Sequence, residues 1–159
     1  MTEAGGIVIK PAVGLADMAV ARQLFTEYQD WLNVDLCFQD FQEELDTLPG
    51  KYAPPAGRLL FAHQGDRVAG TVCLRPLQEN ICEMKRLFVR PDWRGQGLGR
   101  RLAVAIIEEA KQCGYGVMKL DTLTRLFAAE SLYKTLGFVR TQPYCANPED
   151  DVTYMSLDL

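Results

Sequence analysis

The chain has 159 residues, of which 48% are hydrophobic and 24% charged, and its formal net charge is −4. This length suits one ordinary domain, expected over residues 1–159, and this composition is typical of a globular protein rather than a disordered one. No apolar run approaches the roughly 20 residues that a membrane span needs, and the first residues lack the pattern of a secretory signal. The negative charge also disfavours nucleic acid as a partner.

The first half of the chain predicts a strand, two helices and a loop. Residues 7–10 form a short apolar strand. Between residues 17 and 32, apolar side chains recur every three or four positions, as on one face of a helix, with Asp17 as its N-cap. A shorter helix is expected over 40–48, and the Pro- and Gly-rich stretch 48–57 is typical of a surface loop.

The second half predicts strands and helices in alternation. Three strands are expected at 58–63, 67–75 and 81–89, the first two joined by a hairpin turn, which favours antiparallel pairing. The next elements expected are a helix over 97–113, a strand over 117–121 and a helix over 126–136. Because a helix separates the strand 117–121 from the strand before it, we expect a parallel neighbour in this part of the sheet. Two final strands are expected at 138–142 and 152–157. The expected fold is therefore α/β in class, with a mixed, mostly antiparallel twisted sheet and helices on both faces.

The cysteines indicate neither a metal centre nor a disulfide framework. There are five, an odd number, without a C-x-x-C pair, and the only histidine is His63. A zinc site needs clustered ligands, and a disulfide scaffold needs an oxidising compartment. We therefore expect free thiols, no metal and a cytoplasmic location.

A glycine-rich loop follows the predicted strand 81–89 and opens the predicted helix 97–113. The free N–H groups of a first helical turn form an anion site, and glycine lets a phosphate approach closely. The glycines at 95, 97 and 99 lack the G-x-G-x-x-G spacing of a dinucleotide site, and no P-loop Gly-Lys-Ser/Thr occurs. The glycines alone are equally explained as a turn without a ligand. However, six basic residues and one acid between positions 85 and 101 favour one compact anionic ligand.

Three sequence blocks resemble the GNAT superfamily of N-acetyltransferases. Arg94, Gly97 and Gly99 match its acetyl-CoA signature R/Q-x-x-G-x-G/A. The segment 83–91 resembles the strand that precedes the signature, and 128–138 resembles the later block A-x-x-L-Y-x-x-L-G-F. The blocks fall in the family order, and the order of predicted elements extends the resemblance to the whole chain.

The resemblance implies that two strands splay apart and that acetyl-CoA lies in the opening. Its pantetheine would bind the backbone of Leu87, Phe88 and Val89, whose side chains would serve the core. At Leu126 many family members have an asparagine that makes a polar contact with pantetheine, a contact that leucine cannot make. The pyrophosphate of acetyl-CoA would lie on the glycine-rich loop, close to arginines. The residues expected to contact it are Arg94, Gly95, Gln96, Gly97, Leu98, Gly99 and Arg100.

The resemblance also implies direct attack of a neutral amine on the thioester. Tyr133 matches the tyrosine that protonates the departing thiolate, although its helical position alone would make it a core aromatic. The base would be Glu83, which starts the cofactor strand, or Asp121, which ends the next strand. Either carboxylate is equally explained as an exposed charge at a strand end.

The acceptor side would be formed by residues 28–57. Its acids, Glu43, Glu44 and Asp46, would attract a cationic amine or simply form a solvated helix face. We expect a small-metabolite amine as acceptor, with a protein N-terminus or lysine, or a non-catalytic acyl-CoA-binding module, as alternatives; a homodimer would be in keeping with the family. The aromatic residues of the segment either line the acceptor pocket or, more commonly, pack helices on the sheet: Tyr28, Trp31, Phe38, Phe41 and Tyr52.

Overall fold

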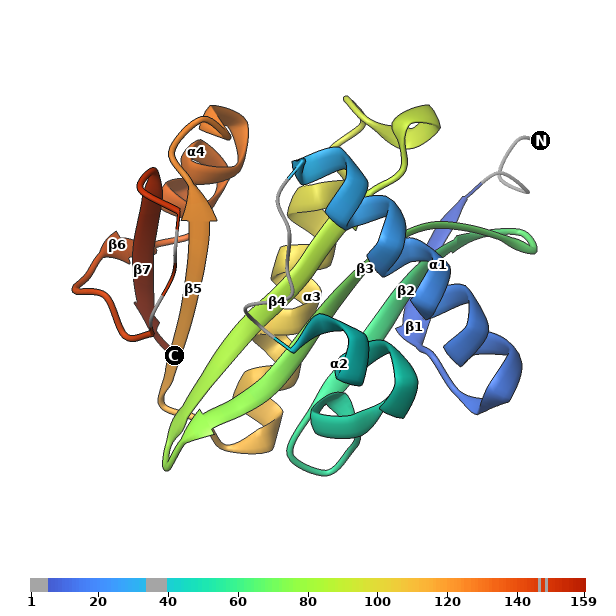
Figure 1. The fold of residues 1–159 in the computed structure, drawn as a ribbon, viewed down its shortest axis with the longest axis horizontal. Helices are drawn as coiled ribbons and strands as arrows, with labels where there is room; N and C mark the ends of the chain where they lie inside the picture. The colour runs from blue at the N-terminus through green and yellow to red at the C-terminus, as the bar shows by residue number, and fades with distance from the viewer. Residues whose placement is uncertain (1–5, 34–39, 146, 148) are drawn as a thin grey trace.

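The computed structural model describes residues 6–33, 40–145, 147 and 149–159. Seven strands form one sheet in the order β1-β2-β3-β4-β5-β7-β6, and every neighbouring pair is antiparallel except β4 and β5 (Figure 1). The elements are β1 (Ile7–Pro11), α1 (Gly14–Leu32), α2 (Phe41–Thr47), η3 (Gly50–Tyr52), β2 (Arg58–Gln64), β3 (Arg67–Gln78), β4 (Ile81–Val89), η4 (Pro91–Trp93), α3 (Leu98–Cys113), β5 (Val117–Leu123), α4 (Phe127–Thr135), β6 (Val139–Arg140) and β7 (Val152–Asp158). The mixed, mostly antiparallel sheet confirms the predicted fold class.

Two hydrophobic clusters lie on opposite faces of the sheet. One joins α3 and α4 to the sheet around Leu102, Ile106 and Phe138. The other joins α1, α2 and η3 to the opposite face around Phe25 and Phe61. Helices therefore cover both faces, as predicted, because alternate residues of each central strand point to opposite sides.

The ends of the elements depart from prediction at three places. Asp17 is not the N-cap of α1: the helix begins at Gly14, and the Asp17 carboxylate instead accepts the N–H of Val13 at 2.8 Å from within the first turn. The stretch 48–57 is not simply a surface loop, because Tyr52 is buried and meets Phe25 edge-on. β6 is shorter than expected, because Phe138 lies in the core and pairing starts only at Val139.

The central strands part where the site is formed. β4 and β5 pair in parallel only where Ile81–Glu83 faces Val117–Lys119. Beyond that short ladder β4 carries a bulge: Thr71 pairs with Phe88 and Cys73 with Lys85, and Arg86 between them has φ 60. A bulge adds one residue to a strand and bends it. The strands splay apart, as the resemblance implied.

No helix in the described part of the chain is long and apolar enough to cross a membrane.

Candidate active site

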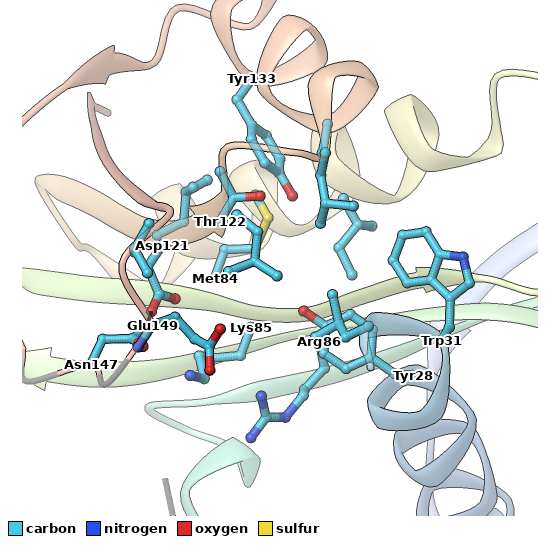
Figure 2. Close-up of a pocket in the computed structure, with 17 residues that line it drawn as sticks. Tyr28, Trp31, Met84, Lys85, Arg86, Asp121, Thr122, Tyr133, Asn147 and Glu149 are labelled. Atoms are coloured by element: carbon cyan, nitrogen blue, oxygen red, sulfur yellow. Dashed lines mark hydrogen bonds between the residues drawn. The ribbon is translucent and has the colours of Figure 1, made fainter. Parts of the chain in front are cut away.

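A cavity of about 120 Å³ lies where β4 and β5 diverge. Its walls come from the C-terminal part of α1, from β4, β5 and α4, and from the segment before β7 (Figure 2). Tyr28 and Trp31 of α1 line it. Of the other aromatic residues expected here, Phe41 and Tyr52 are buried in the core, and Phe38 lies outside the described residues.

Tyr133 projects from α4 with its hydroxyl directed into the cavity (Figure 2). Its side chain is buried, and its ring meets Phe138 edge-on. Burial raises the pKa of the phenol well above its usual value of 10, and the nearby Tyr28 and Asp121 add to the effect. Tyr133 is thus a core aromatic and a cavity residue at once, and its hydroxyl stays protonated at neutral pH.

The two candidate carboxylates lie in different environments. Glu83 is 1% exposed, and it accepts hydrogen bonds from Arg75 Nε at 2.8 Å and from the Tyr144 hydroxyl at 2.6 Å. Burial alone would raise its pKa, but Lys85, Arg75 and these hydrogen bonds outweigh burial and lower the pKa below its usual range. Glu83 is therefore held as a carboxylate in an ion pair, rather than exposed at a strand end.

Asp121 lines the cavity and Glu83 does not. Asp121 lies on β5, and its Oδ2 accepts a hydrogen bond of 3.4 Å from the amide of Asn147. In Figure 2 its carboxylate lies at the same end of the cavity as Lys85, Asn147 and Glu149. The structure thus brings Asp121 and Tyr133 to one cavity, and Glu83 is not among the residues that line it.

The glycine-rich loop has the backbone that an anion site requires. Gly95 and Gly97 both have φ 78, and a Cβ added to either would meet no atom within 4 Å. Gly97 is the N-cap of α3, so no side chain occupies the amides of the first turn. Leu98 is buried and offers only its backbone, whereas Gln96 and Gly99 lie at the surface of the loop and first turn.

The arginines predicted beside the phosphates make specific contacts. Arg94 Nε donates to the carbonyl of Val89 at 2.8 Å, and its guanidinium lies 4.9 Å from the centre of the Trp31 ring. Arg100 donates to Thr135 Oγ1 at 3.0 Å and so links α3 to α4. The Val89 backbone, expected to bind pantetheine, therefore lies next to the loop.

The strand expected to bind pantetheine alternates between the two cores. Phe88 is buried in the cluster on the α1 side, whereas Leu87 and Val89 pack against the cluster on the α3 side. Leu126 lines the cavity. Phe88 and Val89 thus serve the core, as expected, whereas Leu87 both packs on the core and lines the cavity.

The basic stretch from 85 to 101 does not form one patch, contrary to expectation. Arg86 makes a two-pronged ion pair with Glu44 of α2, at 2.9 and 2.8 Å, and Arg90 pairs likewise with Glu27 of α1. Glu44 is thus engaged by an arginine, which neither sequence interpretation of this acid anticipated. Simple alternation along β4 would place Arg86 on the same face as Met84, and the bulge at Arg86 is what directs it to α2 instead.

Among the cavity residues that the sequence interpretation missed, five have polar or charged side chains: Lys85, Arg86, Thr122, Asn147 and Glu149. The last two come from the segment before β7, which has no periodic pattern to place it.

Comparison with known proteins gives a consistent family. Residues 21–138 match the model of the acetyltransferase (GNAT) family. An uncharacterized N-acetyltransferase of Schizosaccharomyces pombe is 41% identical over 90% of this chain and 89% of its own length. An acetyltransferase structure from Streptococcus agalactiae has a TM-score of 0.81 at 21% identity, covering 97% of this chain and 99% of that one. YncA from Salmonella typhimurium, solved with its cofactor acetyl-CoA, has a TM-score of 0.68 at 23% identity, covering 96% and 93%. The chain therefore belongs to the acetyltransferase (GNAT) family and is an acetyl-CoA-dependent N-acetyltransferase.

Proposed function

We propose that the enzyme transfers the acetyl group of acetyl-CoA to the primary amine of a small metabolite. The observation that carries this proposal is the cavity between β4 and β5, into which the Tyr133 hydroxyl points and which Asp121 lines. Tyr28 and Trp31 of α1 line the same cavity, whose volume is about 120 Å³. A pocket of this size suits a small amine.

The glycine-rich loop fits the pyrophosphate of acetyl-CoA. The space around Gly95 and Gly97 is open to a ligand, and the amides of the first turn of α3 carry the positive end of the helix dipole. Arg94 and Arg100 are the charged donors at its rim. The backbone of Leu87, Phe88 and Val89, beyond the short ladder with β5, would bind the pantetheine.

Acetyl-CoA supplies an activated acetyl group as a thioester. Asp121 binds the ammonium form of the acceptor and takes up the proton that the amine must lose, directly or through water. The amine nitrogen bonds to the acetyl carbon and loses its second proton to solvent, the carbon–sulfur bond breaks, and Tyr133 gives its proton to the departing sulfur. Asp121 then releases its proton to solvent and Tyr133 regains one, which leaves an amide and free CoA. Tyr133 suits this role because burial keeps the phenol protonated.

Asp121 is the better candidate base because it borders the cavity, whereas Glu83 is engaged by Arg75 and Tyr144. This choice assigns Glu83 a structural role.

A cytoplasmic location is part of the proposal, supported by the free thiols of Cys73, Cys82, Cys113 and Cys145. The proposal also includes a homodimer. The edge strand β6 supports a dimer, because an edge strand can pair with another chain and Val139 is exposed there.

The proposal is tested by incubating the enzyme with acetyl-CoA and a library of primary amines while free thiol is measured. We expect thiol release with a subset of small amines, and loss of release in Asp121→Asn with acetyl-CoA binding retained. Acetyl-CoA should also raise the melting temperature, whereas NAD and ATP should not. Acetyl-CoA binding without release on any amine would instead indicate a non-catalytic acyl-CoA-binding protein.

A further inference from the structure

The acceptor end of the cavity contains a buried lysine that the proposed reaction does not use. Lys85 lines the cavity from β4, and only 7% of the residue is exposed. The bulge at Arg86 places Lys85 and Arg86 together on the face of β4 that α1 and α2 cover, because Arg86 reaches Glu44 of α2. A buried ammonium is costly unless opposite charge is close.

Charges of both signs lie around Lys85. Arg86 adds positive charge next to it, Glu83 is shared with Arg75 and Tyr144, and Asp121 also accepts from Asn147. Burial and Arg86 lower the pKa of Lys85, and the attraction of Glu83 and Asp121 does not restore it. Because Lys85 lines the cavity, an anionic group of a ligand bound there would lie beside its buried ammonium. The three N–H donors of an ammonium can bind it alongside protein partners.

The cavity wall holds charges of both signs. Its cations are Lys85 and Arg86, of which Arg86 is already paired with Glu44, and its carboxylates are Asp121 and Glu149. Figure 2 shows Lys85, Asp121 and Glu149 gathered at one end of the cavity, below the Tyr133 hydroxyl. A ligand that carries one charge of each sign complements such a wall better than a purely cationic amine.

We propose that the acceptor is an amino acid, with its carboxylate bound by Lys85 and its amine held between Asp121 and Tyr133. This inference rests on the proposed N-acetyltransferase function. The side chain of the amino acid would extend toward Tyr28 and Trp31, which form the aromatic wall at the other side of the cavity.

Matched sets of amines test the inference. Each set contains an amino acid, its amide and its decarboxylated amine, for example L-leucine, L-leucinamide and 3-methylbutylamine, and thiol release from acetyl-CoA gives kcat/KM. For at least one side chain we expect the amino acid to exceed both analogues by about tenfold or more, as expected for recognition of a buried charge. The amide is intrinsically favoured, because its less basic amine is more often neutral. A preference for the amino acid must therefore come from the enzyme.

Lys85→Gln should remove this preference while leaving the affinity for acetyl-CoA near the wild-type value. Lys119→Gln is the matched control, because Lys119 lies on β5 over the ring of Tyr144 and does not line the cavity. Equal or faster turnover of amides or decarboxylated amines throughout the sets would overturn the inference and leave the proposed function intact. Absence of turnover with every amino acid and every analogue would overturn both the inference and the proposed function.

Discussion

The hydroxyl of Tyr144 donates a 2.6 Å hydrogen bond to the carboxylate of Glu83. Tyr144 lies in the segment between β6 and β7, and Glu83 lies at the end of the ladder between β4 and β5. Arg75 of β3 binds the other oxygen of the same carboxylate. The buried carboxylate of Glu83 thus links β3, β4 and the segment between β6 and β7, at the point where β4 and β5 diverge. The same segment contains the cavity residues Asn147 and Glu149.

Tyr144→Phe should lower the free energy of unfolding by about 1.5–3 kcal/mol, because it removes a hydrogen bond to a charged and buried group. Urea denaturation at neutral pH measures this change. Tyr154→Phe is the control, since the Tyr154 hydroxyl makes only a 3.3 Å bond to the exposed carbonyl of Cys145 and should contribute far less. Equal losses of unfolding free energy in the two variants would show that the hydrogen bond from Tyr144 to Glu83 contributes no more stability than the weaker bond of Tyr154.

Glu83→Gln should destabilise the protein at neutral pH and progressively less in acid. The pKa of Glu83 is lower in the folded protein than its usual value of 4.5, so the folded state favours the charged form. The stability that this charge contributes is complete above pH 4.5 and is lost as the pH falls through the lower, folded-state pKa. The difference in unfolding free energy between wild type and variant should therefore shrink below that pH, as measured by urea denaturation across a pH series. A difference that is constant with pH would contradict the lowered pKa.

Tyr133→Phe should reduce kcat by about a hundredfold or more, the usual effect of losing a general acid, with little change in the affinity for acetyl-CoA. Because burial raises the pKa of Tyr133 above 10, the wild-type rate should show no alkaline loss from this group until the pH exceeds 10. Thiol release on the best amine of the library, followed across pH, checks both statements. Full activity of the variant would make Tyr133 a core residue only.

Gly97→Ala should weaken acetyl-CoA binding by about tenfold or more, because its Cβ would enter space that a phosphate needs. The substitution should also cost about 1–2 kcal/mol of stability from the left-handed backbone. Gly65→Ala separates the two effects, since Gly65 also has a positive φ and open surroundings but lies in the hairpin between β2 and β3. Both variants should lose stability, but only Gly97→Ala should lose affinity for acetyl-CoA. The affinity is measured from the rise in melting temperature as acetyl-CoA is added. Similar affinities for acetyl-CoA in the two variants would mean that the phosphates do not bind at Gly97.

The order of the elements could be predicted, and the glycine-rich loop could be singled out as a candidate anion site, because both depend on local patterns. Apolar periodicity located the helices, and the glycines at 95, 97 and 99 with their strand and helix indicated an anion site before any fold was known. Tyr133 could be assigned only through the resemblance, since its position on the apolar stripe of α4 is equally that of a core residue.

The choice between Glu83 and Asp121 could not be predicted, because it depends on contacts distant in the sequence. Tyr144 is 61 positions from Glu83, and Arg86 meets Glu44 across 42 positions. The bulge that turns Arg86 toward α2 has no marker in the sequence either, because a non-glycine residue occupies the positive φ. The acceptor side of the cavity is therefore visible only in the folded chain.

Acetyl-CoA should change the fluorescence of Trp31 through Arg94. The chain has two tryptophans, and each lies under an arginine: Arg94 is 4.9 Å from the ring centre of Trp31, and Arg67 is 4.5 Å from that of Trp93. If the guanidinium of Arg94 turns to the phosphates, the surroundings of the half-exposed Trp31 change, whereas those of the buried Trp93 do not.

In a Trp93→Phe background, which leaves Trp31 as the sole indole, saturating acetyl-CoA should shift or quench the emission. Arg94→Ala should abolish this response and weaken binding by about tenfold, as expected for the loss of a charged phosphate contact. Arg67→Ala, the matched control, should alter neither, because Arg67 lies over Trp93 and pairs with Asp92 away from the cavity. An unchanged emission, in protein whose melting temperature acetyl-CoA does raise, would mean that Arg94 stays on Trp31 while the loop holds its ligand.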